Sequence, residues 1–237
     1  MMHGLIDRQY VTKLKTDPSF NEESFAREYL SIWSGASSES WFNFNKMEKY
    51  RKIKNPEFHA KNRPNSDQFY LLSVDVARLK GCQTVVCIFR VNIVQGKYYA
   101  TLVNVVVLGK QMEDKTFTQQ AIDLKKLILA FNPRECLIDC NGLGVGLADE
   151  MIKEQVDKDG NLLPAYGFFN NDDYKKIQPK DCSCILYSMK ANSALNSQIN
   201  GTTYARINGG LVHFLIKEQE AKSALLATKV GQKMSIE

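Results

Sequence analysis

Residues 69–78 read Phe-Tyr-Leu-Leu-Ser-Val-Asp-Val-Ala-Arg, an apolar run that carries a single carboxylate, Asp75. Near-continuous apolar runs are typical of strands that are covered on both faces of a sheet, so this stretch is predicted to be a central strand. An ionised carboxylate in such a strand is costly to desolvate unless a positive group meets it. A metal ion, or the exposed end of the sheet, is therefore the expected partner of Asp75.

A second stretch has the same form. Residues 135–142 read Glu-Cys-Leu-Ile-Asp-Cys-Asn-Gly, a short apolar strand that ends on Asp139. Hard oxygen ligands bind Mg²⁺ or Mn²⁺, and two such ions about 4 Å apart can clamp an in-line phosphoryl displacement. If the two strands are neighbours, Asp75 and Asp139 emerge at one edge as the metal ligands of a nuclease. The alternative is that each acid is an ordinary polar residue that caps a loop at a strand end.

The composition is that of an ordinary globular protein. The chain has 237 residues, of which 44% are hydrophobic and 24% charged. Its net charge of +5 permits nucleic-acid binding without requiring it. No apolar run approaches the roughly 18 residues of a membrane span, and the N-terminus lacks the pattern of a signal peptide. The six cysteines form no CxxC pair, which favours reduced thiols in a cytosolic protein.

The order of the predicted elements gives the fold class. An amphipathic helix is expected at 20–33, followed by an aromatic cluster and a polar linker at 46–68. The elements expected after the linker are strands at 69–77, 83–93 and 97–108, a helix at 117–131, a strand at 135–140, a helix at 146–156, a strand at 165–169, a loop at 170–184, a helix at 187–199, turns at 201–210, a strand at 211–216 and a helix at 217–229. Antiparallel strands followed by strand–helix crossovers predict an α/β ribonuclease-H-like mixed sheet with flanking helices. The expected domains are an N-terminal appendage and linker at 1–68 and the ribonuclease-H-like domain at 69–237.

Three alternate glycines follow Asp139. Gly142, Gly144 and Gly146 could form a nest of amides that contacts DNA phosphates, or a tight turn that lies close against the sheet. The dinucleotide-binding fingerprint fails because Leu147 stands where its third glycine belongs, and no GK[ST] phosphate loop is present. Both interpretations of the glycines stay open.

Four single basic residues are candidate phosphate contacts. They are Arg78, Lys80, Lys110 and Lys190. The alternative for each is a solvated surface charge. The three histidines leave little room for histidine-based zinc chemistry.

At this point four segments resemble a known family. "YLLSVDVAR" at 70–78 and "LIDCNGLGVGL" at 137–147 look like the first two acidic motifs of the nuclease domain of the tailed-bacteriophage terminase large subunit. "FLIKEQEAKSALLATKVGQKMS" at 214–235 is similar to a late segment of that domain. "FNEESFAREYLSIWSG" at 20–35 looks like the end of the ATPase domain and its linker.

The resemblance implies a ribonuclease-H-like fold and a two-metal endonuclease that uses Mg²⁺ or Mn²⁺ to cut concatemeric viral DNA during packaging. It makes Asp75 and Asp139 the first and second catalytic metal ligands, with Arg78, Lys80, Gly142 and Gly144 at the DNA. The implied partners are double-stranded DNA, the terminase ATPase domain, the small terminase subunit and the portal, in the cytoplasm of a bacterial host.

The sequence departs from the family pattern in two places. It carries no Walker motifs, so this chain is not expected to hydrolyse ATP. The family's third acid lies beyond the segment that matches 217–235, and Glu218, Glu220 and Glu237 do not stand in the matching context. The chain is therefore expected to be truncated at both ends. The alternatives are a catalytically deficient DNA-binding or assembly module of the same fold, and an unrelated nuclease or resolvase of the same superfamily.

Overall fold

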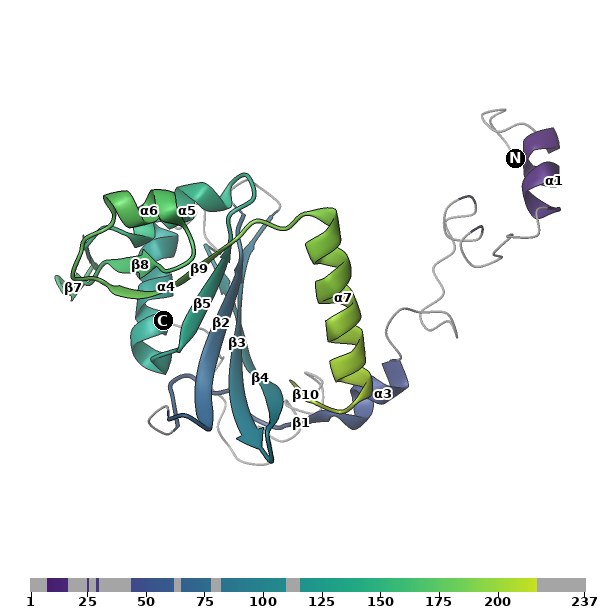
Figure 1. Ribbon diagram of the computed structural model, residues 1–237, viewed down its shortest axis with the longest axis horizontal. Coiled ribbons are helices and arrows are strands. Elements are labelled where there is room, and N and C mark those ends of the chain that lie inside the picture. The colour runs from purple at the N-terminus through teal and green to yellow at the C-terminus, as the bar shows by residue number, and fades with distance from the viewer. Residues whose placement is uncertain are drawn as a thin grey trace. The chain divides into compact units, whose positions relative to one another are not determined.

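The structure is a computed structural model that separates into two compact units, 1–44 and 45–237 (Figure 1). The residues that it describes are 8–16, 25, 29, 44–61, 65–77, 82–109 and 116–216. In the first unit, helix α1 spans Arg8–Lys15. The helix predicted at 20–33 lies almost wholly outside the described residues, apart from Phe25 and Tyr29, whose rings stack with centroids 5.0 Å apart.

The second unit is built on an eight-stranded sheet in the order β1-β10-β4-β3-β2-β5-β9-β8. The strands are β1 (Arg51–Ile53), β2 (Gln68–Asp75), β3 (Thr84–Val94), β4 (Lys97–Leu108), β5 (Glu135–Asp139), β8 (Tyr166–Phe168), β9 (Ser183–Met189) and β10 (Val212–Leu215). Strands β2, β3 and β4 form an antiparallel meander, and β5, β9 and β8 continue the sheet in parallel on the other side of β2. The order β4-β3-β2-β5-β9 is that of a ribonuclease-H-like sheet, which confirms the predicted fold class.

Helices cover one face of this sheet closely. Helix α4 (Phe117–Phe131) packs on β2, where the rings of Tyr70 and Phe131 lie 5.4 Å apart, and α5 (Gly144–Met151) packs beside α4. Helix α4 begins where the sequence predicts, because the side chain of Thr116 accepts a hydrogen bond from the amide of Gln119. Short α6 (Asp172–Ile177) and a hairpin of β6 (Gln155–Val156) and β7 (Leu162–Leu163) complete this side.

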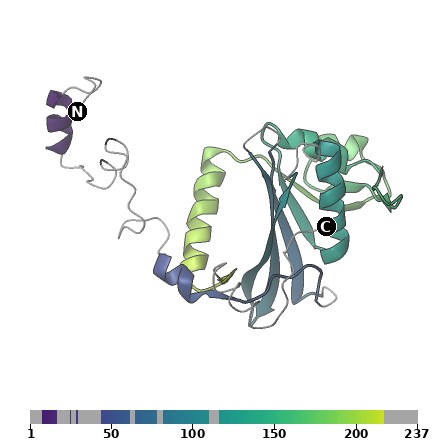
Figure 2. The same ribbon diagram turned by 180° about the vertical axis from the view of Figure 1, so that it is seen from behind.

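The other face of the sheet has a different neighbour. Helix α7 (Ser193–Asn208) stands on the side of the sheet opposite α4, as both views show (Figures 1 and 2). Ile207 is its one buried residue. A helix that is polar all round has no apolar stripe to bury, so among the described elements α7 covers little of this side, which we call the open face of the sheet. No helix within the described ranges is long and apolar enough to cross a membrane.

The prediction for the stretch after residue 183 was wrong. A helix was expected at 187–199 and turns at 201–210, whereas residues 183–189 form β9 and residues 193–208 form α7. Strand β9 pairs on both edges, with β5 and β8, which overrides the helical spacing of its apolar residues. Helix α6 likewise lies inside the expected loop at 170–184, and the helix expected at 217–229 falls outside the described residues.

The structure also differs from the linker expected at 46–68. Helix α3 (Phe44–Lys49) leads into β1, which pairs with β10 at the edge of the sheet. Glu57 is 3% exposed, and its main chain is held by bonds from its amide to the Val103 carbonyl at 3.0 Å and from the Asn104 side chain to its own carbonyl at 2.8 Å. The polar composition of residues 46–68 gave no sign of this packing, because a buried network of charged side chains holds the stretch to the sheet in place of apolar side chains. The assignment of 1–68 as an appendage stays a prediction.

The carboxylate of Glu57 is the centre of that network. It accepts a hydrogen bond from the Tyr70 hydroxyl at 2.8 Å and lies 2.9 Å from the guanidinium of Arg90 and 3.1 Å from the ammonium of Lys61. The contacts at its Oε1 have the geometry of ion pairs rather than hydrogen bonds. Burial raises the pKa of Tyr70, which keeps its hydroxyl a donor. Glu57 therefore fastens the entering chain to β2 and β3.

We expect Glu57→Ala to lower the free energy of unfolding by about 3 kcal/mol, because it leaves the half-buried Arg90 without its partner. Urea unfolding followed by circular dichroism measures this change. The matched control is Glu48→Ala, which breaks the more exposed pair with Arg51 and should cost less than about 1 kcal/mol. Equal losses in the two variants would contradict a structural role for the buried network.

Candidate functional site

The site is set by the register between β2 and β5. These strands pair in parallel, with Ser73 opposite Leu137 and Val74 opposite Ile138. The next residue of each strand is an aspartate, Asp75 in β2 and Asp139 in β5. The two carboxylates therefore stand at the same level on neighbouring strands, whose backbones lie about 4.8 Å apart in a sheet.

Side-chain alternation decides which face the acids occupy. Val74 and Ile138 are buried in the core under the helices, at 2% and 0% exposure, so Asp75 and Asp139 project from the opposite, open face. Asp75 is exposed and Asp139 is half-buried. The pKa of the Cys87 thiol is raised, first by burial and then by the negative charge of Asp75. Asp75 pairs with Val85, so its carboxylate lies beside β3 on that face.

Asp139 is held by the turn that follows it. Its Oδ1 accepts a hydrogen bond from the amide of Asn141 at 2.9 Å, and the amide of Cys140 donates to the carbonyl of Met189 at 2.8 Å. The Asn141 side chain donates to the Ala191 carbonyl at 3.5 Å. The turn is thus fastened to the end of β9. The sequence analysis did not single out Asn141; the signal for the turn is Asp139 itself, because an aspartate side chain often accepts a hydrogen bond from the amide two residues on.

The three glycines differ in what surrounds them. A Cβ on Gly144 would lie 1.6 Å from the carbonyl oxygen of Asp139, and one on Gly146 would lie 2.3 Å from the ring of Phe117. These close approaches are those of a tight turn against the sheet. Gly142 is exposed, has a φ of +60° and meets nothing within 4 Å. The DNA contacts predicted for Gly142 and Gly144 stay predictions, and the buried Gly144 offers little surface for one.

Of the four candidate basic residues, the structure describes Lys190. Arg78, Lys80 and Lys110 lie outside the described residues. Lys190 is exposed and comes directly after Met189, the residue of β9 that pairs with Asp139. Lys190 therefore stands at the same edge of the sheet as the two acids.

The donor set suits one hard cation. Mg²⁺ is usually held by one or two carboxylates together with waters and substrate phosphates, and Asp75 and Asp139 supply that number. Among the residues that the structure describes, no group of three histidine, cysteine or acidic side chains could hold a metal ion. Glu218, Glu220 and Glu237 fall outside those residues. The described donors therefore fit one ion and give no ligand set for a second.

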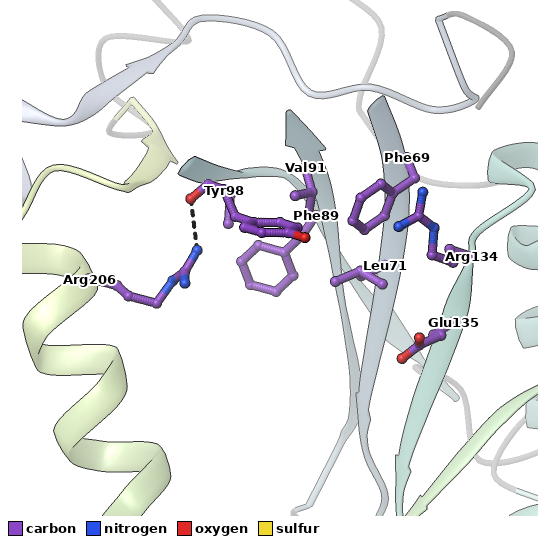
Figure 3. Close-up of a pocket in the computed structure, with 9 residues that line it drawn as sticks. Phe69, Leu71, Phe89, Val91, Tyr98, Arg134, Glu135 and Arg206 are labelled. Atoms are coloured by element: carbon purple, nitrogen blue, oxygen red, sulfur yellow. Dashed lines mark hydrogen bonds between the residues drawn. The ribbon is translucent and has the colours of Figure 1, made fainter. Parts of the chain in front are cut away.

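A pocket of about 520 Å³ opens on the same face, toward the other end of the strands (Figure 3). Sequence analysis did not find it, because its walls come from segments far apart in the chain. The pocket is lined by Phe69, Leu71, Phe89, Val91, Tyr98, Ala100, Arg134, Glu135 and Arg206.

Solved structures that are similar to this chain include viral terminase nucleases. The large terminase nuclease of thermophilic phage G20c with bound cobalt has a TM-score of 0.41 and 13% identity over 77% of this chain and 77% of that chain. The magnesium-bound form of the same nuclease gives 0.38 and 14% over 70% and 72%. The manganese-soaked, inhibitor-bound terminase nuclease domain of human cytomegalovirus gives 0.34 and 10% over 82% and 87%. No family model and no curated protein matches the sequence. At these identities the likeness concerns the fold alone.

We expect Gly144→Ala to lower the free energy of unfolding by about 1–3 kcal/mol, because the added methyl group would overlap the backbone of Asp139. Backbone atoms cannot relieve this overlap by changing rotamer, as a side chain could. Thermal and urea unfolding measure the loss. Gly201→Ala is the matched control, since Gly201 lies within α7 with nothing within 4 Å of its Cβ position. That change should stabilise the protein by about 0.5–1 kcal/mol. Two changes of the same sign would show that the contact at Asp139 is not tight.

Proposed function

We propose that the chain is the metal-dependent endonuclease domain of a phage DNA-packaging terminase, which cuts concatemeric double-stranded DNA by phosphodiester hydrolysis. One observation carries this proposal. The parallel register of β2 and β5 brings Asp75 and Asp139 to one level and one face of the sheet. The resemblance of 70–78 and 137–147 to the acidic motifs of that family supports the same conclusion.

Each residue of the site has a part in this chemistry. Asp75 and Asp139 would hold Mg²⁺ or Mn²⁺, which when bound polarises the phosphodiester and lowers the pKa of a water that attacks it. The amide of Asn141 fixes the orientation of the Asp139 carboxylate. Lys190 contributes positive charge beside the acids, where a DNA phosphate would lie. By the same proposal Arg78, Lys80, Gly142 and Gly144 contact the DNA.

The strength of the activity depends on the second ion. Mg²⁺ gives up its waters reluctantly and demands near-ideal octahedral geometry, so two carboxylates hold it loosely. Loss of a second ion removes stabilisation of the attacking or the leaving oxygen. We therefore propose slow, non-specific nicking that is faster in Mn²⁺ than in Mg²⁺, with salt-sensitive binding of DNA through its phosphates.

A second candidate function follows from the donor count. Two acids without a third among the described residues favour a catalytically deficient module that binds DNA or assembles with other subunits. The terminase ATPase domain, the small terminase subunit and the portal are the partners proposed in either case, in the cytoplasm of the bacterial host. Cleavage of plasmid DNA separates the two functions.

We expect the chain to nick supercoiled plasmid in Mn²⁺, and the nicking to fall at least about 100-fold in Asp75→Asn or Asp139→Asn, because each loses half of the metal-binding charge. Agarose-gel assays of the relaxed product, with and without EDTA, measure the rates. Asp173→Asn is the control, because Asp173 is an exposed acid paired with Lys176 on α6.

Two results would count against the proposal. Nicking that persists in EDTA or in Asp75→Asn would place the chemistry in other residues. Binding of plasmid without nicking, in the same Mn²⁺ buffer, would favour the catalytically deficient module.

A further inference from the structure

The sheet face that carries Asp75 and Asp139 is broad and apolar. Side chains of β2, β3 and β4 that alternate with the buried core residues point to this face, and α7 covers little of it. Val105 is 43% exposed and Tyr98 48% exposed. Contiguous exposed apolar patches mark interaction sites, which makes this face a candidate for one.

The pocket on this face has an apolar floor and charged walls. Leu71, Phe89 and Val91 form the floor, and Tyr98 also lines the pocket (Figure 3). Arg206 of α7 stands at one side, while Arg134 stands at the other. Aromatic rings between two guanidinium groups form a surface that combines stacking with positive charge.

The charges of both arginines remain available to an anion. Arg206 donates to the Tyr98 carbonyl at 2.8 Å, and Arg134 donates to the carbonyls of Asn65 and Ser66 at 3.2 and 3.3 Å. Arg134 also lies 3.5 Å above the ring of Phe69. Carbonyls position a guanidinium without neutralising it, and neither arginine has an ion pair with a carboxylate of the described residues. Glu135 is the acid that lines the pocket, so the lining carries net positive charge.

The pocket is aligned with the two acids. Leu71 in its floor and Asp75 are four residues apart on one unbroken strand and point to the same face. At about 3.3 Å per residue the separation is about 13 Å. A strand stacked as in a duplex spans that length with roughly four nucleotides at about 3.4 Å each, and a more extended unpaired strand spans it with fewer.

We propose that the open face binds an unpaired segment of a DNA strand, with bases stacked on Phe89 and Tyr98 and phosphates at Arg134 and Arg206. Aromatic rings with flanking arginines are the groups that hold single strands without sequence preference. In a duplex the bases stack on one another, and their faces do not reach rings that lie on a pocket floor. The proposal deepens the proposed nuclease function, on which it rests for the nature of the substrate, by directing the chain to unpaired segments of the double-stranded DNA, where the duplex is melted or frayed.

Binding of short oligonucleotides in EDTA tests this proposal without any cleavage. The probes are a fluorescein-labelled twelve-residue oligothymidylate and a blunt twelve-base-pair duplex, followed by fluorescence anisotropy at several salt concentrations. We expect the single strand to bind at least about tenfold more tightly than the duplex. Phe89→Leu keeps the apolar bulk but removes the ring, and should weaken single-strand binding about tenfold, the loss of one stacked base.

The charge contribution is read from the salt dependence. Arg206→Gln removes one phosphate contact, so the slope of log K against log salt should become shallower by about 0.7 for the single strand. Lys180→Gln removes the same charge at an exposed position on the turn before β9, outside the pocket lining, and should leave affinity and slope unchanged. Circular dichroism spectra confirm that each variant is folded.

Three outcomes would overturn the proposal. They are equal or tighter binding of the duplex, single-strand binding that neither Phe89→Leu nor Arg206→Gln changes, and a dimer in sedimentation that Phe89→Leu dissociates, which would assign the face to a second copy. Failure of the nuclease proposal looks different. A chain that binds the single strand as expected but does not nick plasmid in Mn²⁺ supports this inference and contradicts the nuclease.

Discussion

The parallel pairing of β2 with β5 is the constraint on which the rest of this molecule depends. It buries Val74 and Ile138 side by side under the helices and so turns the following residues, Asp75 and Asp139, to the open face. A slip of one residue would move the apolar set of one strand into solvent and one acid into the core. The burial of apolar side chains that stabilises the core therefore also sets the positions of the two acids. No further contact is needed to bring them together.

The elements around this pair hold it from several sides. The turn after Asp139 is short enough to place the first turn of α5 against the strand end, and this close approach requires Gly144. Before β2, the buried carboxylate of Glu57 fastens the entering chain to Tyr70 and Arg90. Both contacts involve polar or backbone atoms, whose distances and directions are restricted to a narrow range. They fix the position of β2 and β5 more narrowly than apolar packing alone would.

Much of this could be predicted from the sequence, because the central strands and α4 carry strong local signals. Alternating or continuous apolar runs gave β2, β3, β4 and β5 to within a residue or two, and Thr116 with Asn132 gave the ends of α4. The signals failed where tertiary contacts decide. Helix α7 has no apolar stripe to recognise, and β9 takes its conformation from the strands on both sides.

The site was predictable in part for the same reason. Asp75 and Asp139 stand out because each interrupts or ends an apolar run, and a carboxylate in such a place needs an explanation. The pocket could not be predicted, because Phe69, Tyr98 and Arg206 come together only when the meander and α7 are placed. Chemistry carried by one segment is visible in a sequence, whereas a surface assembled from distant segments is not.

The open face links the two proposals physically. Two carboxylates leave most positions around a hard cation to water and to phosphate oxygens, so under both proposals DNA bound on this face would complete the site. Metal and DNA then increase each other's affinity by the same factor, as linkage requires. A site with few protein ligands therefore depends on its substrate to hold the ion. Under the same proposals the apolar floor and the arginines would supply that substrate affinity at a distance from the acids, so a weak metal site and a large open face are consistent with each other in one molecule.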